Sequence, residues 1–232
     1  MMEPNAQAET ARKLKRKMSW AFPLAVVVTG LMLFLPAGSL RYWQAWMFLA
    51  TLFPPVLFVV SYFLTRDPNL LARRMQFQEK EREQQVLVKL ATLAFFLGFL
   101  FPGFDYRYGW SDIPVWVSVS ADLLVFLGYA IVFFVFRENS YTSRIVEVAD
   151  GQKVVSTGPY SLVRHPMYAG IILMYLSIPV ALGSFWALAF FVPVVALIVV
   201  RALDEERVLM RDLEGYPEYA QKVRYRLVPR VW

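Results

Sequence analysis

Residues Trp43 to Leu64 read WQAWMFLATLFPPVLFVVSYFL, and this run settles the class of protein. It contains no charged side chain. A bilayer core about 30 Å thick is crossed by about 20 consecutive, mostly apolar residues, because each backbone amide there must be hydrogen-bonded inside its own helix. The run is therefore predicted to be a transmembrane helix.

The rest of the chain has the same character. The 232 residues are 58% hydrophobic and 16% aromatic, which is outside the ordinary range of soluble domains. The absence of cysteine excludes disulfides, thiolate metal ligands and cysteine nucleophiles. The net charge of +6 comes from basic residues that flank the apolar runs, so anionic lipid headgroups are the expected partner and nucleic acid is not. No metal site is expected.

Further apolar runs predict a polytopic, all-α membrane protein with roughly six crossings. Pro102-Gly103 should end the third run, and Gly183-Ser184 should join the last two as a tight C-terminal hairpin. Residues 66–89 form a polar connection that is either a surface-lying helix or a solvated loop. Besides 43–64, the predicted spans are 20–35, 86–101, 115–136, 166–182 and 185–203.

The basic residues predict the orientation. Only Arg41 and Arg107 fall on one face. Every other Lys and Arg lies at the N-terminus, in or directly after connections 66–89 and 137–163, or from Arg201 near the end of the last span onward. Cytoplasmic loops are enriched in Lys and Arg. Both termini are therefore expected in the cytoplasm, with the first span as a retained anchor. The membrane would be the inner membrane in a bacterium or the endoplasmic reticulum in a eukaryote.

Residues 154–170, VVSTGPYSLVRHPMYAG, concentrate polar and turn-forming groups directly before an apolar run. Gly158-Pro159 is a turn signal. Pro166 suits the first position of a helix, which places His165, the one histidine of the chain, at its cap. Free N–H groups there would hold an anion such as an amino-acid carboxylate. The alternative is an ordinary helix start.

A second polar group lies where the last span ends. Arg201 and Glu205 are four residues apart on one helical face, and Glu206 follows. Placing ionisable groups at this depth costs free energy, so they are usually paired with an opposite charge or have a function. The alternative is a pair that reaches the headgroups and only terminates the helix. Several tyrosines near this face suit either a membrane interface or contact with a cationic ligand.

These motifs form an ordered series that resembles the isoprenylcysteine carboxyl methyltransferase family and its phospholipid methyltransferase relatives. The resemblance covers about the last 95 residues, from Asn139 onward, and residues 1–136 match only as a set of spans. The series consists of Gly158-Pro159-Tyr160, Arg164 to Gly170, Arg201 with Glu205-Glu206 and Leu209, Gly215-Tyr216, and Tyr219.

The resemblance implies two regions. Residues 1–136 would form a membrane region, and residues 137–232 a methyltransferase-like region that binds S-adenosyl-L-methionine. By position, Arg201 and Glu205 would be catalytic and face the reacting group. The residues implied to bind the cofactor are Val155, Ser156, Gly158, Tyr160, Arg164, His165, Tyr168 and Glu206.

The implied acceptor is lipophilic, a small molecule or a prenylated substrate, and its reacting group is a carboxylate as in isoprenylcysteine. Arg201 would hold that carboxylate through two parallel hydrogen bonds, whereas a lipid amine or small thiol would need Glu205 as a base.

Two other functions stay open: a non-catalytic membrane protein, and an NADPH-dependent reductase of the sterol type, which shares the Arg-His-Pro motif. The reductase pattern ends in an acid where this chain has Ile171. The oligomeric state is left open.

Overall fold

The computed structural model describes residues 4–74, 82–141 and 151–232, and these parts of the chain contain helices and no strand. The all-α prediction is thus confirmed for them. The elements are α1 (Pro4–Ala37), α2 (Trp43–Arg66), α3 (Pro68–Arg74), α4 (Arg82–Tyr108), α5 (Val115–Glu138), the short 3-10 helix η1 (Gly158–Ser161), α6 (Pro166–Ala181), α7 (Leu188–Asp212) and α8 (Tyr216–Lys222).

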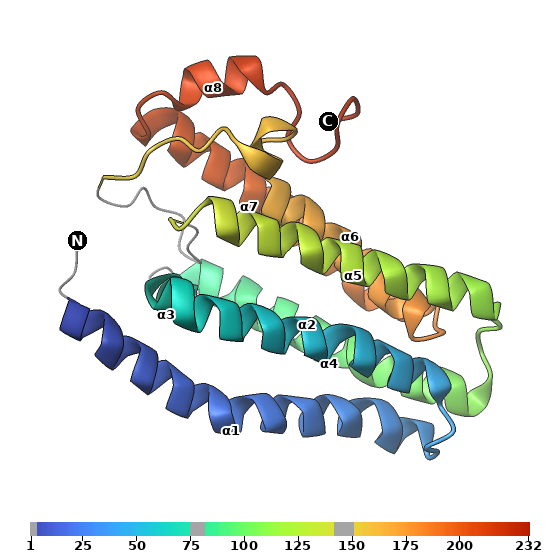
Figure 1. Ribbon diagram of the computed structural model, residues 1–232. Coiled ribbons are helices and arrows are strands. Elements are labelled where there is room, and N and C mark those ends of the chain that lie inside the picture. Colours follow the sequence, from blue (N-terminus) through green and yellow to red (C-terminus); the bar gives the residue numbers. More distant parts are fainter. Residues whose placement is uncertain (1–3, 75–81, 142–150) are drawn as a thin grey trace.

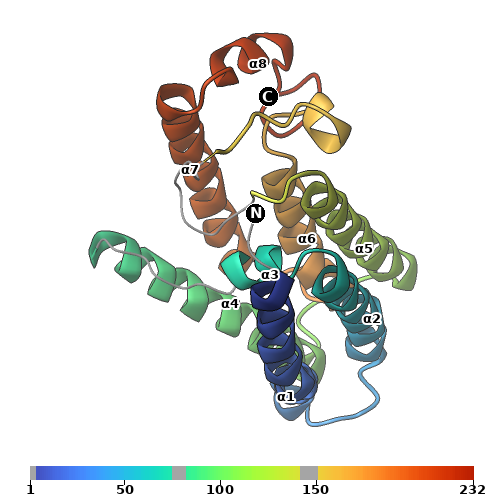
Figure 2. The same ribbon diagram turned by 60° about the vertical axis from the view of Figure 1, so that its left-hand side comes forward.

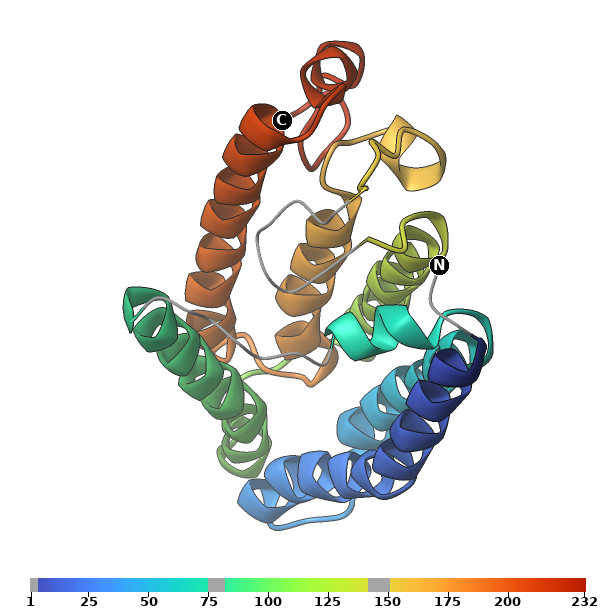
Figure 3. The same cartoon turned by 90° about the vertical axis from the view of Figure 1, so that its left-hand side faces the viewer.

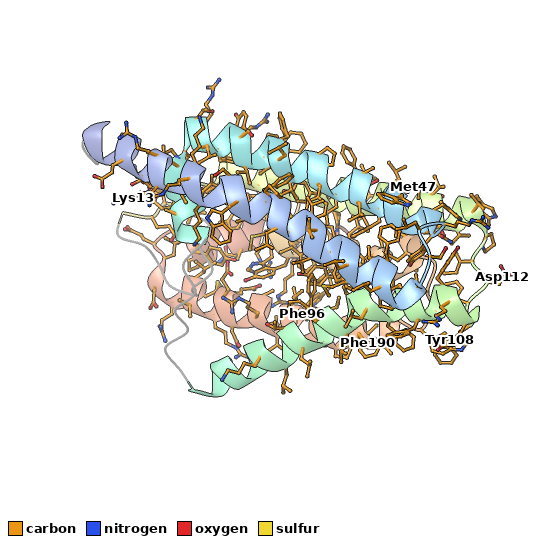
Figure 4. All side chains as sticks on the ribbon, turned by 90° about the horizontal axis from the view of Figure 1, so that it is seen from below. Lys13, Met47, Phe96, Tyr108, Asp112 and Phe190 are labelled. Atoms are coloured by element: carbon orange, nitrogen blue, oxygen red, sulfur yellow. The ribbon has the colours of Figure 1, made fainter. Side chains whose placement is uncertain are left out.

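The long helices lie side by side, and the short elements α3, η1 and α8 gather at one end of the bundle (Figure 1). We call the end that carries α3, η1 and α8 the tail end. The opposite end holds the turns between α1 and α2 and between α6 and α7. Figure 4 shows Lys13 near the tail end and Tyr108 and Asp112 at the opposite end. The beginning of α4 points away from its neighbours (Figure 2).

Among the described residues, three helices are long and apolar enough to cross a membrane, namely Glu9–Ala37, Trp43–Arg66 and Val115–Glu138. They agree with three predicted spans. The apolar helix α6 has 16 residues, about 24 Å at 1.5 Å per residue, which is shorter than a bilayer core. The total of six crossings stays a prediction.

One predicted boundary is wrong: Pro102-Gly103 does not end a helix, and α4 continues to Tyr108. The glycine serves packing between helices instead. A Cβ at Gly103 would lie 2.5 Å from the carbonyl oxygen of Leu33 on α1. Proline is tolerated inside membrane helices, where neighbouring helices help satisfy the backbone.

The last two helices form the predicted hairpin, but their connection covers residues 182–187 and is longer than the predicted Gly183-Ser184 link. Gly183 adopts a φ of +76°, and the Ser184 amide donates to the Pro179 carbonyl, so α6 turns directly toward α7. The second helix is longer than expected and continues beyond the predicted end at residue 203 to Asp212. This extension carries Glu205 and Glu206 on regular helix.

The connection 66–89 also differs from its expectation. Residues 82–89 already belong to α4, and residues 68–74 form α3, whose Leu70 is fully buried against Val59 and Phe63. The Asp67 side chain accepts a hydrogen bond of 3.0 Å from the Leu70 amide and caps α3. Residues 75–81 lie outside the described residues, so the rest of this expectation stays untested.

Candidate functional site

A partly open pocket lies at the tail end, between the start of α6 and the end of α7. Its remaining walls come from α8 and from the extended segment that precedes η1, and Figure 3 looks onto this end of the bundle. The lining residues are Asn139, Tyr141, Gln152, Lys153, Val154, Val155, Tyr160, Arg164, His165, Pro166, Met167, Tyr168, Glu205, Val208, Leu209, Leu213, Tyr216 and Tyr219.

The predicted helix start is confirmed, because α6 begins at Pro166 with His165 in the cap position. The histidine ring does not cap the helix. Its backbone amide donates to the carbonyl of Arg226 at 2.9 Å, and the amide of Arg164 donates to that of Tyr225 at 2.9 Å. The chain's tail is therefore held against the start of α6.

The carboxylate of Glu206 joins three basic side chains from two distant segments. Its Oε1 accepts a hydrogen bond of 2.9 Å from Arg164, and its Oε2 lies 3.1 Å from His165 Nε2 and accepts a hydrogen bond of 3.0 Å from Arg226 Nε. Burial raises the pKa of Glu206, but the hydrogen bonds from His165 and Arg226 and the charge of Arg164 outweigh burial and bring the pKa to about 2. Glu206 is therefore an anion that links α6, α7 and the tail.

This network bears on the predicted role of Glu206 as a cofactor contact. Glu206 does not line the pocket described above; it lines a shallow neighbouring depression with Leu203, Arg207 and Arg226. Its direct contact with a cofactor stays a prediction. In the structure its position fixes Arg164 and His165, which do line the pocket.

The other predicted group surrounds Tyr168. The hydroxyl of Tyr168 donates to Glu205 Oε2 at 2.5 Å, and its ring lies 5.9 Å from the ring of His165. Arg201, one turn earlier on α7, also interacts with the Tyr168 side chain and is half-buried. The structure thus brings together His165, Tyr168, Arg201 and Glu205, of which Arg201 does not line the pocket.

The segment before α6 contributes unevenly. Val155 and Tyr160 line the pocket, whereas Ser156 is exposed and lies outside the lining. Gly158 has a φ of +57°, as its turn requires, but it faces Glu138, 3.1 Å from where its Cβ would be. The predicted turn is confirmed, and the part of Ser156 and Gly158 in binding stays a prediction.

Two buried polar atoms in the pocket lining have no hydrogen-bond partner among the described residues, Arg164 Nε and the hydroxyl of Tyr216. Burial raises the pKa of Tyr216 well above its ordinary value, with the charge of Glu206 adding to the effect, so the phenol stays protonated. Both atoms can donate a hydrogen bond. Unpaired buried donors suit a ligand that brings an acceptor such as a carboxylate.

Sequence reasoning did not assign Tyr216, Tyr219, Asn139, Gln152 or Lys153 to the site. For the first two, the signals were the clustering of tyrosines and the motif series, which contains Gly215-Tyr216 and Tyr219. The Tyr219 hydroxyl donates to the Tyr160 carbonyl at 2.7 Å, and Asn139 donates to the Tyr160 hydroxyl at 3.1 Å. Tyr160 is thereby held between α8 and the end of α5.

The pocket has a cavity volume of about 80 Å³. Sites for small molecules ordinarily measure about 300–1,000 Å³. A nucleoside-sized ligand would therefore need the lining side chains to move apart, or would lie partly outside the pocket.

Comparison with known proteins finds two similarities. Delta(14)-sterol reductase of Mus musculus is 32% identical over 90 residues, which are 38% of this chain and 22% of the reductase. The chain thus matches about a fifth of that protein's length. The sequence model of the phospholipid methyltransferase family matches residues 116–214, which contain α5, η1, α6 and α7. The part of the chain that builds most of the pocket is therefore similar to the membrane methyltransferases of the phospholipid methyltransferase family.

Proposed function

We propose that the protein is a membrane methyltransferase that binds S-adenosyl-L-methionine in the tail-end pocket and methylates a lipophilic acceptor. The observation that carries the proposal is the convergence of His165, Tyr168 and Glu205 on one pocket inside the segment that matches the methyltransferase family. A carboxylate of an isoprenylcysteine-like molecule is the proposed acceptor. A lipid amine or a small thiol is the alternative within the same class.

The residues of the pocket fit such a cofactor. Arg164 Nε and the Tyr216 hydroxyl are buried donors without a partner among the described residues, and they would pair with the carboxylate of an amino-acid group. The rings of Tyr160, Tyr168 and Tyr219 line the same space and suit a cationic sulfonium. When bound, the cofactor supplies an electrophilic methyl carbon.

The remaining groups would orient the acceptor. Because methyl transfer is a direct displacement, alignment and electrostatics would carry most of the catalysis. Arg201 would hold an acceptor carboxylate by a forked pair of hydrogen bonds, and Glu205 would orient the guanidinium. A carboxylate acceptor needs no base, whereas an amine or thiol would give its proton to Glu205, whose Oε2 already accepts a hydrogen bond from Tyr168.

The place of the pocket suits both reactants. It lies at the end of α5, a helix apolar enough to cross a membrane, and Asn139 at the end of that helix is part of its lining. A water-soluble cofactor can enter from the aqueous side. A lipophilic acceptor arrives within the bilayer, so the boundary is where the two can meet.

The test is calorimetric titration of the purified protein with S-adenosylhomocysteine and, separately, with NADPH. We expect micromolar binding of S-adenosylhomocysteine and no binding of NADPH. The reverse result would support a membrane reductase, the second candidate, which the similarity to a Delta(14)-sterol reductase favours. Binding of neither compound would favour a non-catalytic membrane protein.

A further inference from the structure

Residues 226–232 close into a small loop at the tail end of the bundle, where Figure 1 marks the C-terminus, and we call them the tail loop. The amides of Leu227 and Val228 donate to the carbonyl oxygen of Trp232 at 2.9 and 3.0 Å. The Trp232 amide donates back to the Val228 carbonyl at 3.1 Å. These backbone hydrogen bonds fix the place of Trp232.

The turn of the tail loop holds one residue in an unfavourable backbone conformation. Arg230 has a φ of +65°, and among the described residues it is the one residue other than glycine with a positive φ. A residue with a side chain adopts this left-handed conformation at a cost in free energy, which the surrounding contacts must offset. The geometry of the loop is therefore imposed by its contacts, among them those of Trp232.

The ring of Trp232 packs on the side chain of Arg226. The guanidinium carbon of Arg226 lies 5.5 Å from the centre of the ring. The same guanidinium donates from Nε to Glu206 Oε2 at 3.0 Å. Because a guanidinium is attracted to the face of an indole and loses rotamer freedom there, Trp232 holds Arg226 in the orientation that reaches Glu206.

Glu206 passes this constraint on to the pocket. Its Oε2 is shared between Arg226 and His165 Nε2, and its Oε1 accepts from Arg164. Because Glu206 is an anion and can only accept a hydrogen bond, the proton in its contact with His165 is carried by Nε2. The orientation of the His165 ring and the nitrogen that holds its proton therefore depend on the position of Oε2.

We propose that Trp232 is a positioning residue for the candidate site. It fixes Arg226 on Glu206, and Glu206 in turn orients His165 and Arg164 in the pocket. Neither Trp232 nor Arg226 lines the pocket, so their effect on binding passes through Glu206. The identity of the ligand as S-adenosyl-L-methionine rests on the proposed function, whereas the orientation of His165 does not.

Because His165 is the one histidine of the chain, protein labelled with ¹⁵N-histidine gives a single pair of imidazole signals in NMR. In detergent and without ligand, Trp232→Ala should shift the Nε2 signal and speed the exchange of its proton with water. Trp232→Phe, which keeps a ring beside the guanidinium, should restore the wild-type signal. The control is Phe134→Ala, because Phe134 also lies beside an arginine, Arg137 at 5.0 Å, and is 43% exposed against 39% for Trp232. An unchanged signal in Trp232→Ala, or an equal shift in Phe134→Ala, would overturn the proposal.

A second pair of variants tests the tail loop without removing a ring, and it decides the question if Trp232→Ala does not fold. Arg230→Gly suits a positive φ and should keep the wild-type signal of His165. Arg230→Val places a β-branched side chain in that conformation, so it should open the loop and act like Trp232→Ala. Equal His165 signals in the two Arg230 variants would contradict the proposal.

Titration with S-adenosylhomocysteine connects the tail loop to binding. Trp232→Ala should weaken binding by about fivefold, the equivalent of about 1 kcal/mol for one cation–π contact, and Trp232→Phe should recover it. Wild-type affinity in Trp232→Ala would overturn the positioning role. A wild type that binds no S-adenosylhomocysteine, with a His165 signal that still responds to Trp232→Ala, would refute the proposed function and support the role of Trp232.

Discussion

At the scale of single residues, the site depends on Glu206. One buried carboxylate faces two guanidinium groups and an imidazole, and these four residues come from three segments that are far apart in the sequence. The sequence placed Glu206 at the end of the last span, and the family resemblance implied that Glu206, His165 and Arg164 share one cofactor site. It could not reveal Arg226 as a partner, since that contact depends on how the tail returns across α6.

We expect Glu206→Ala to destabilise the protein by about 3–5 kcal/mol, because it leaves the buried cation Arg164 without its anion. Thermal unfolding in detergent measures the loss. The control is Glu205→Ala. Glu205 accepts a hydrogen bond from the hydroxyl of Tyr168, a neutral group, so its loss should cost much less. Similar losses for the two variants would mean that Glu206 does not hold these segments together.

The pKa of Glu206 also predicts a dependence of stability on pH. The pKa is lowered from the ordinary 4.5 to about 2 in the folded protein, so the unfolded chain takes up a proton first as the pH falls. The stability from Glu206 should be fully present above about pH 4.5 and should disappear as the pH approaches 2. The difference in unfolding temperature between the wild type and Glu206→Gln should shrink over that window, and a constant difference would contradict it.

At the scale of elements, apolar runs predicted the positions of most helices but not how the helices touch. The spans at 43–64 and 115–136 and the turn at Gly183-Ser184 could be placed from composition and turn chemistry. Pro102-Gly103 looked like a helix end because both residues favour turns. Gly103 in fact contacts the backbone of α1, and a single sequence holds no signal for such a long-range approach.

The helix contact gives a prediction with an internal control. Gly103→Ala should lower stability by about 1–3 kcal/mol, because its Cβ would lie 2.5 Å from the Leu33 carbonyl oxygen on α1. Gly30→Ala, where nothing lies within 4 Å of the new Cβ, should leave stability unchanged or slightly higher. Urea or thermal unfolding in the same detergent separates the two, and an equal effect would argue against the close contact of α1 and α4.

At the scale of the whole molecule, two motifs far apart in the sequence meet at one end of a helical bundle. The sequence predicted this meeting because both motifs lie next to basic residues, which place them on one side of a membrane. The motif series contains Tyr216 and Tyr219, but it did not show that they line the pocket, since α8 reaches the pocket only through the turn at Gly215. The division at residue 136 and the number of crossings stay predictions.

Because the chain has no cysteine, its orientation can be tested with single introduced cysteines. In intact cells, Ser39→Cys between α1 and α2 should react with a membrane-impermeant maleimide. Glu214→Cys, between α7 and α8 at the tail end, should react only after the membrane is opened. The opposite pattern would invert the predicted topology, and reaction of both cysteines in intact cells would place them on the same side.

The proposed methyltransferase activity is tested most directly in membranes that contain the protein. The measurement is transfer of a labelled methyl group from S-adenosyl-L-methionine to a lipid-extractable acceptor, such as an isoprenylcysteine analogue. We predict transfer by the wild type, and a loss of at least about tenfold, or about 1.4 kcal/mol in the barrier, in Arg201→Ala and Glu205→Ala. Both variants should still bind S-adenosylhomocysteine. Full transfer by both variants, or no transfer by a wild-type protein that binds the cofactor, would contradict it.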